Sequence, residues 1–127
     1  MKIALVIGYG SIGKRHVKIL TKFKKFKKIV VFTKQKIKNY NTISNLAEIR
    51  KLNPSYIVIS TRTNEHFKYL AYCEKYFSGK TILVEKPVFE KIRQMSIRKN
   101  KVYVGYNLRF HPVIQKIKQV IKKKRNI

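Results

Sequence analysis

Three glycines near the start of the chain have the spacing of a phosphate-binding turn. Gly8, Gly10 and Gly13 form the pattern G-x-G-x-x-G, directly after the apolar run 3–7 and directly before a segment with helical periodicity. In such a turn the first glycine permits a sharp bend, the second lets the backbone approach a pyrophosphate, and the third lets the helix pack on the strand. The pattern predicts a dinucleotide site, and the alternative is a glycine turn that serves packing alone.

The residues that would meet the adenosine ribose depart from the usual form of this motif. An acidic residue about 20 positions after the glycines normally binds the ribose hydroxyls of NAD. Here that region holds Thr33 and Lys34, and the first acidic residue after the glycines is Glu48. A hydroxyl followed by lysines suits a ribose phosphate, so the sequence favours NADP slightly over NAD. The other reading is that these lysines belong to the general excess of basic residues.

That excess is large. The chain has 31 Lys and Arg against 5 acidic residues, which gives a net charge of +26. Such a charge is typical of proteins that bind nucleic acid or another polyanion. The basic residues are spread along the whole chain, however, and Lys, Ile, Asn, Tyr and Phe, which AT-rich codons encode, are all abundant. A compositional bias explains the charge at least as well, so we expect nucleic acid to bind only through nonspecific attraction.

The glycine turn would be positioned by alternating strands and helices. With 44% hydrophobic residues, the 127-residue chain has enough apolar material for one folded domain. Five apolar runs predict strands buried on both faces, and the segments between them predict helices. The sequence therefore predicts a Rossmann-type α/β fold, a doubly wound parallel sheet in three α/β/α layers. The expected strands are 3–7, 28–32, 56–59, 81–84 and 102–105, and the expected helices are 11–22, 46–52, 63–77, 88–99 and 112–124.

Individual residues mark several of these boundaries. Ser44 or Asn45 is expected to cap the second helix, and Thr63 or Asn64 the third. Cys73 is the single cysteine, so no intramolecular disulfide is possible, and a reducing compartment is expected. There is no run long enough to span a membrane, no secretory signal and no metal-ligand spacing, so we expect a cytoplasmic protein without membrane or metal partners.

Taken with the glycine turn, three further motifs give the chain a specific resemblance. It resembles the N-terminal half of the glucose-fructose oxidoreductase and inositol dehydrogenase family, Gfo/Idh/MocA, over essentially its whole length. Members of that family oxidise or reduce a sugar or polyol carbinol by hydride transfer with NAD or NADP. The three motifs are Ser60-Thr61-Arg62-Thr63-Asn64-Glu65-His66, Glu85-Lys86-Pro87 and Gly105-Tyr106-Asn107-Leu108-Arg109-Phe110.

The resemblance implies roles for individual residues. Lys86 would polarise or orient the substrate hydroxyl, Pro87 would follow a cis peptide bond, and Arg62 stands where many members have proline. Asn107 and Arg109 would flank the cleft, and Glu85 would lie near the nicotinamide. The remaining cofactor-binding residues that it implies are Gly8, Gly10, Ser11, Ile12 and Gly13 at the pyrophosphate, with Ser60, Thr61, Asn64 and His66 beside the cofactor.

Physical chemistry alone leaves alternatives for the charged residues. All these motifs follow predicted parallel strands, at the edge where open α/β sheets bind ligands. Lys86 could act as a general acid if partial burial lowered its pKa, and Glu85 would oppose that change. Otherwise, Glu85 and Lys86 form an exposed charge pair at the end of a strand. His66 could equally cap or pack the start of its helix.

The resemblance also predicts how the chain is divided. Residues 1–111 would be the NAD(P)-binding domain, and 112–127 a helix that leads into a substrate domain which this chain lacks. We therefore expect the cofactor-binding half of a truncated oxidoreductase without an independent catalytic centre: a fragment, a degenerate gene product or one part of a split enzyme. Its expected protein partners are a separate C-terminal chain or further copies of itself. The alternatives are a noncatalytic nucleotide-binding or partner subunit and a basic polyanion-binding protein.

Overall fold

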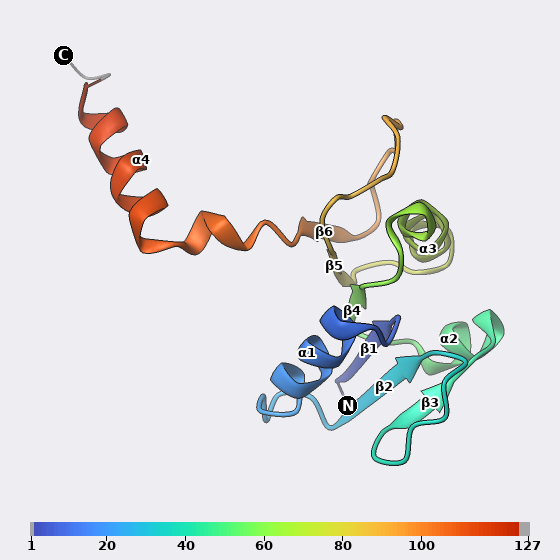
Figure 1. Cartoon of the computed structure of the whole chain (residues 1–127). Helices are drawn as coiled ribbons and strands as arrows, with labels where there is room; N and C mark the ends of the chain where they lie inside the picture. The colour runs from blue at the N-terminus through green and yellow to red at the C-terminus, as the bar shows by residue number, and fades with distance from the viewer. Residues whose placement is uncertain (1, 125–127) are drawn as a thin grey trace.

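The computed structural model describes residues 2–124 and contains one parallel sheet with helices on both faces (Figure 1). The 6-stranded sheet has the order β3-β2-β1-β4-β5-β6. This order confirms the predicted Rossmann-type α/β fold. The strands are β1 (Ile3–Ile7), β2 (Lys28–Phe32), β3 (Asn41–Ile43), β4 (Tyr56–Ile59), β5 (Thr81–Val84) and β6 (Lys101–Val104). The short strand β3, at one edge, was not predicted because two of its three residues, Asn41 and Thr42, are polar.

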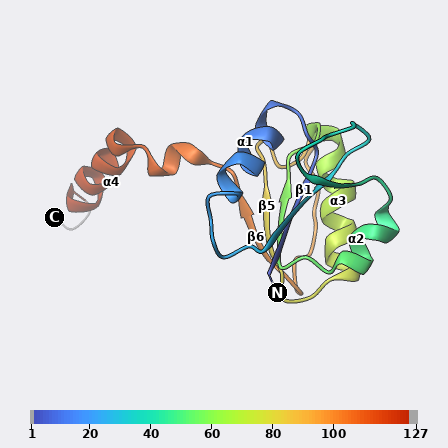
Figure 2. The same ribbon diagram turned by 90° about the horizontal axis from the view of Figure 1, so that it is seen from below.

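The helices cover the two faces of the sheet unequally. Helix α1 lies against one face, whereas α2 and α3 lie against the other (Figure 2). Their bounds are α1 (Ser11–Leu20), α2 (Leu46–Leu52), α3 (Thr63–Tyr76) and α4 (Pro112–Lys124), with a short 3-10 helix, η1 (Asn107–Phe110), before α4. The face that carries α1 is therefore covered only over the middle of the sheet, which leaves Tyr103 of β6 half exposed on that side.

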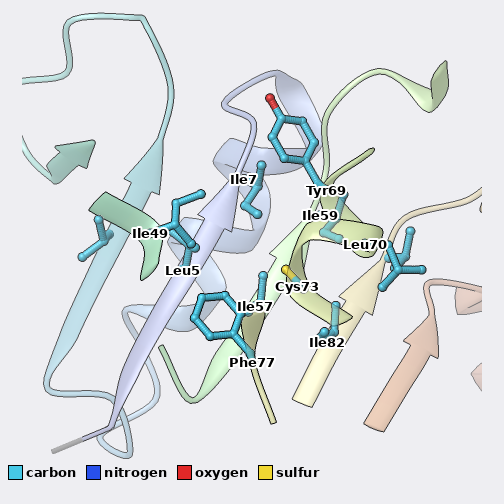
Figure 3. Close-up of a cluster of buried hydrophobic side chains, with 12 residues drawn as sticks. Leu5, Ile7, Ile49, Ile57, Ile59, Tyr69, Leu70, Cys73, Phe77 and Ile82 are labelled. Carbon is cyan, nitrogen blue, oxygen red and sulfur yellow. The ribbon is translucent and has the colours of Figure 1, made fainter. Parts of the chain in front are cut away.

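The core follows directly from the apolar strands. Alternate residues of β1 point to opposite faces: Leu5 and Ile7 pack toward α2 and α3, whereas Ala4 and Val6 pack toward α1. All four are fully buried, which is why the sequence of this strand is continuously apolar rather than alternating. Figure 3 shows the larger cluster, between the sheet and helices α2 and α3.

Cys73 lies inside this cluster with its side chain fully buried. Burial raises the pKa of its thiol to about 12, with a smaller contribution from Glu74. The thiol stays protonated at neutral pH, so Cys73 acts as a small apolar core residue rather than as a nucleophile.

The two predicted helix caps have different outcomes. Asn45 caps α2 as expected, and Glu48 completes a capping box by accepting a hydrogen bond from the Asn45 backbone N–H. The prediction for α3 was wrong, because Arg62 is the N-cap and its side chain makes no capping bond. Helix α3 already begins at Thr63, since the connection from β4 is short.

The predicted helix over 88–99 is also wrong, because this segment is irregular. Its apolar residues Val88, Phe89 and Met95 pack against the core, while Ile92 is fully exposed. The guanidinium of Arg93 lies 4.6 Å from the ring centroid of Phe67. These anchors are spread along an extended path, which a single helical face does not match.

The end of the segment is held by one carboxylate. Glu74 of α3 accepts hydrogen bonds from the backbone N–H groups of Arg98 at 2.7 Å and Lys99 at 2.6 Å, and from the Asn100 side-chain amide at 2.8 Å. Slight burial tends to raise the pKa of Glu74, but these hydrogen bonds and the Lys99 charge outweigh it and hold the pKa below its usual value. The ionised carboxylate therefore stabilises this segment.

We expect Glu74→Gln to loosen the segment without unfolding the domain. Losing a charged acceptor should reduce the hydrogen-exchange protection of the Arg98 and Lys99 amides by about tenfold. Because the folded-state pKa lies below the unfolded one, the contribution is present above the unfolded pKa and is lost as pH falls through the folded value. The protection of these two amides in the wild type should therefore fall when the pH is lowered through the folded-state pKa of Glu74. In the variant, protection should be the same above and below that pKa. If protection fell equally in both proteins, the role assigned to Glu74 would be contradicted.

Helix α4 projects away from the rest of the molecule (Figure 1). It contacts the 3-10 helix that precedes it, and its apolar side chains remain exposed. These exposed residues are Val113, Ile117, Val120 and Ile121. The helix thus presents an apolar stripe that nothing in residues 2–124 covers.

Candidate functional site

A cleft of about 830 Å³ opens at the carboxyl ends of β1, β2 and β4. Strand β1 pairs with β2 on one side and with β4 on the other, so the loops that follow these three strands form its floor and opposite walls. Open α/β sheets bind ligands at this position. Eight of the predicted site residues line the cleft: Gly8, Gly10, Ser11, Ile12, Thr33, Lys34, Ser60 and Thr61.

The three glycines of the turn differ in what surrounds them. Gly8 has a φ of +99°, and a Cβ there would lie 2.8 Å from the Ser60 carbonyl oxygen. A Cβ on Gly13 would lie 2.2 Å from the Gly8 carbonyl oxygen. By contrast, a Cβ on Gly10 would meet no atom within 4 Å. The fold therefore requires glycine at 8 and 13, whereas at 10 the space in front of the backbone is open.

Ser60 fastens the glycine turn to the neighbouring strand. Its side chain is buried, and its hydroxyl lies 3.2 Å from the carbonyl oxygen of Ile7 and 3.3 Å from that of Gly8. Its backbone N–H also donates to Ile7 at 2.9 Å. Ser60 thus both lines the cleft and sets the position of the turn.

The wall beyond β2 carries hydroxyl, amide and ammonium groups. Thr33 accepts a hydrogen bond from the Gln35 backbone N–H at 3.1 Å, and Lys34 lines the cleft beside them. Glu48 lies further along this side, but it accepts hydrogen bonds from the backbone of Ser44 and Asn45. No carboxylate from residues 2–124 occupies the position that follows β2 in the motif, as the sequence predicted.

The opposite wall contains residues that the sequence analysis did not assign to the cofactor site. Arg62, Glu65 and Lys68 line the cleft from the start of α3, and Tyr69 adds an apolar surface together with Phe32. The rings of Phe32 and Tyr69 are 5.7 Å apart. The spacing of three residues between Arg62, Glu65 and Lys68 indicates one helical face, which would have identified this wall.

His66 does not line the cleft. It is 1% exposed, and Nδ1 lies 3.0 Å from the carbonyl oxygen of Pro87 while Nε2 lies 3.1 Å from that of Thr61. The imidazole therefore links the loop after β4 to the loop after β5. This geometry corresponds to the packing alternative rather than to a residue at the edge of the cleft.

Three other predicted residues surround a second, smaller cavity. Glu85, Asn107 and Arg109 line a space of about 360 Å³ on the α1 side of β5 and β6. The carboxylate of Glu85 lies 2.6 Å from Nε2 of His16 on α1. A Cβ on Gly105 would lie 3.0 Å from that carboxylate. The Glu85 carboxylate therefore packs closely against the backbone at Gly105, where a side chain would crowd it.

Lys86 and Asn64 lie outside both of these spaces. Lys86 follows β5, and its peptide bond to Pro87 is cis, as the resemblance implied. Its side chain is exposed, so the partial burial expected for a general acid is not present. Asn64, the second residue of α3, is exposed as well.

Residues 2–124 hold neither a cluster of metal-binding side chains nor a membrane-spanning helix. Within that range, no group of three His, Cys, Asp or Glu side chains is arranged to hold a metal ion. None of the helices described has the length and apolar character needed to cross a membrane.

The strand order, the glycine turn and the open space at Gly10 define a dinucleotide-binding domain of the Rossmann type. The family model described as the oxidoreductase family with an NAD-binding Rossmann fold, GFO_IDH_MocA, matches residues 2–103. The chain belongs to this family, as the sequence motifs indicated, and residues 2–103 are its NAD-binding domain. No curated protein sequence matches the chain.

Solved structures agree with the fold. The apo scyllo-inositol dehydrogenase from Lactobacillus casei superimposes with a TM-score of 0.80 at 17% identity, covering 98% of this chain and 42% of that one. The WlbA dehydrogenase from Thermus thermophilus, solved with NAD and UDP-GlcNAcA, superimposes with a TM-score of 0.75 at 17% identity. The match covers 97% of this chain and 47% of that one. The chain thus spans less than half of the length of these two proteins.

Proposed function

We propose that the cleft binds a nicotinamide dinucleotide with its pyrophosphate against Gly10 and the first turn of α1. The observation that carries the proposal is the contrast among the glycines: Gly8 and Gly13 are required by packing, whereas nothing lies within 4 Å of a Cβ built on Gly10. Glycine at 10 is thus explained by a ligand that approaches the backbone. The residues proposed to surround this ligand are Gly8, Gly10, Ser11, Ile12, Gly13, Ser60 and Thr61.

For the adenosine end, we propose a modest preference for NADP over NAD. Thr33 and Lys34 line the cleft after β2, where a carboxylate would be needed to accept hydrogen bonds from both ribose hydroxyls. A hydroxyl and an ammonium group favour a ribose phosphate instead. The NAD-bound relatives do not test this preference, which depends on these two side chains.

The proposed reaction is hydride transfer to or from the carbinol carbon of a sugar or polyol. The nicotinamide, when bound, accepts or supplies the hydride. Lys86, exposed at the carboxyl end of β5, would donate a hydrogen bond that polarises and orients the substrate oxygen, while the hydroxyl proton is exchanged with solvent. The scyllo-inositol dehydrogenase from Lactobacillus casei solved with NAD(H) and scyllo-inositol, at 16% identity, supports this class of substrate.

Residues beyond the cleft would complete the substrate site. The exposed apolar stripe of α4 supports a role as the packing surface for a substrate-binding part, in line with the proposed boundary after residue 111. Glu85, Asn107 and Arg109, around the second cavity, follow β5 and β6 at the carboxyl edge of the sheet. They would form one side of the substrate site.

The direct test is titration of the protein with NAD and NADP at moderate ionic strength, followed by a turnover assay with cyclitols and sugars. Saturable binding with turnover would support the proposed reaction. Binding without turnover of any polyol would favour a noncatalytic nucleotide-binding subunit. Failure of both cofactors to bind would overturn the proposal and leave the basic charge as the best guide to function.

If the protein turns over a substrate, Lys86→Met should reduce kcat by about 10- to 100-fold, the range expected for losing a charged hydrogen bond to the reacting oxygen. The dissociation constant of the cofactor should stay unchanged, because Lys86 lies outside the cleft. Lys91→Met, at another exposed lysine in the same connection between β5 and β6, is the matched control. Equal kcat values for the two variants would exclude Lys86 from the reaction.

A further inference from the structure

We infer that Arg62 selects a dinucleotide that carries a phosphate on its adenosine ribose, acting with Lys34 from the opposite wall of the cleft. This inference rests on the proposed dinucleotide site, and it assigns discrimination to a residue outside the glycine turn and the β2 loop.

Arg62 and Lys34 lie on opposite sides of the cleft. Arg62 is the N-cap of α3 and follows β4 by a short connection, whereas Lys34 follows β2. Because β2 and β4 flank β1 in the sheet, the two residues approach the cleft from opposite sides. Both line it. A ligand that enters above β1 therefore meets a cation on each side.

The fold makes no use of the Arg62 side chain. Its backbone has φ −65° and ψ 147°, a conformation open to most residues, proline included. The side chain is exposed, and it forms no hydrogen bond, ion pair or aromatic contact with any residue in 2–124. The guanidinium is therefore available to a ligand without breaking an existing interaction.

The two cationic side chains match the chemistry of a phosphate group. A guanidinium offers a planar pair of N–H donors that match two phosphate oxygens, and an ammonium adds a point charge. The carboxylate on the same wall is Glu65, one turn further along α3, which limits but does not cancel the positive charge of Arg62, Lys68 and Lys34. A cleft with this balance of charge favours a ligand with an additional phosphate over the same ligand without it.

The test compares NADP with NAD, and 2′,5′-ADP with 5′-AMP, by calorimetry on the full chain at fixed ionic strength. Arg62→Ala should lower the affinity for NADP and 2′,5′-ADP by about 10- to 100-fold, as expected for losing a charged hydrogen bond. NAD and 5′-AMP should change less than about threefold. Arg62→Lys should recover part of the loss, because it restores the charge but not the paired donors.

The matched control is Arg15→Ala, an exposed arginine of α1 that lines neither cavity and removes the same charge. It should leave all four affinities unchanged. Equal weakening of NAD and NADP by Arg62→Ala, or equal loss in the Arg15 variant, would overturn the selection by Arg62 while leaving the dinucleotide site in place. If the wild type binds neither NAD nor NADP, the proposed function fails, and the inference fails with it.

Discussion

Gly13→Ala is expected to destabilise the domain strongly, by about 2 kcal/mol or more. The added Cβ would lie 2.2 Å from the Gly8 carbonyl oxygen, 2.9 Å from the Gly8 carbonyl carbon and 3.0 Å from the Ser60 hydroxyl. Two of these atoms belong to the backbone, so α1 must move away from the turn. The higher helix propensity of alanine offsets only about 1 kcal/mol of this cost. Thermal unfolding followed by circular dichroism should show a midpoint lower by about 10 °C.

Gly10→Ala is the matched control, because it adds the same methyl group three positions earlier in the motif. Gly10 has φ −75°, and its Cβ would meet nothing within 4 Å. We expect its unfolding free energy to stay within about 1 kcal/mol of the wild type, the range for changes at an N-cap. If the Gly13 variant were as stable as this control, the close contact between the turn and α1 would not exist in solution.

Gly10→Leu is expected to abolish dinucleotide binding while the domain stays folded. The leucine side chain would fill the space in front of the turn, where we propose that the pyrophosphate lies. Because the pyrophosphate could no longer approach the backbone, the affinities for NAD and NADP should both fall by at least about 100-fold, or about 2.7 kcal/mol. A neutral side chain is chosen so that electrostatic attraction to the phosphates is unchanged. Calorimetric titration of the purified variant measures the effect.

A size series separates this explanation from a general loss of structure. Gly10→Ala should weaken binding less than Gly10→Leu, and both variants should retain the wild-type unfolding midpoint within a few degrees. Undiminished affinity in the leucine variant would show that the phosphates lie elsewhere, and the proposed site would have to be abandoned.

The sequence alone predicted the features that depend on neighbours along the chain. Buried strands such as 3–7 and 28–32 were recognised because their apolar residues run without interruption. The glycine turn was recognised because its geometry depends on residues five positions apart. Asn45 was recognised as a cap because its partners lie within one turn of α2. Interactions of this kind join residues that are close in the sequence, so a short segment is enough to predict them.

The features that the sequence did not predict depend on contacts between distant residues. The segment 88–99 has a composition compatible with a helix, but anchors on α3 and on the core hold it in an extended path. His16 and Glu85 are 69 positions apart, and they meet because α1 lies across the face of the sheet, where its His16 reaches the residue that follows β5. His66 could have lined the cleft or packed, and the carbonyl groups of two separate loops determine that it packs.

The cleft combines both kinds of information. The three strands that carry the cleft, β1, β2 and β4, and the residues that follow them could be predicted from the sequence, including Thr33 and Lys34 after β2 and Arg62 after β4. Only the tertiary structure decided that β1 lies between these two strands, so that their loops face each other across the glycine turn. The reason is physical: hydrophobic periodicity specifies that a segment is buried, but the pairing of buried segments is decided by packing over the whole domain.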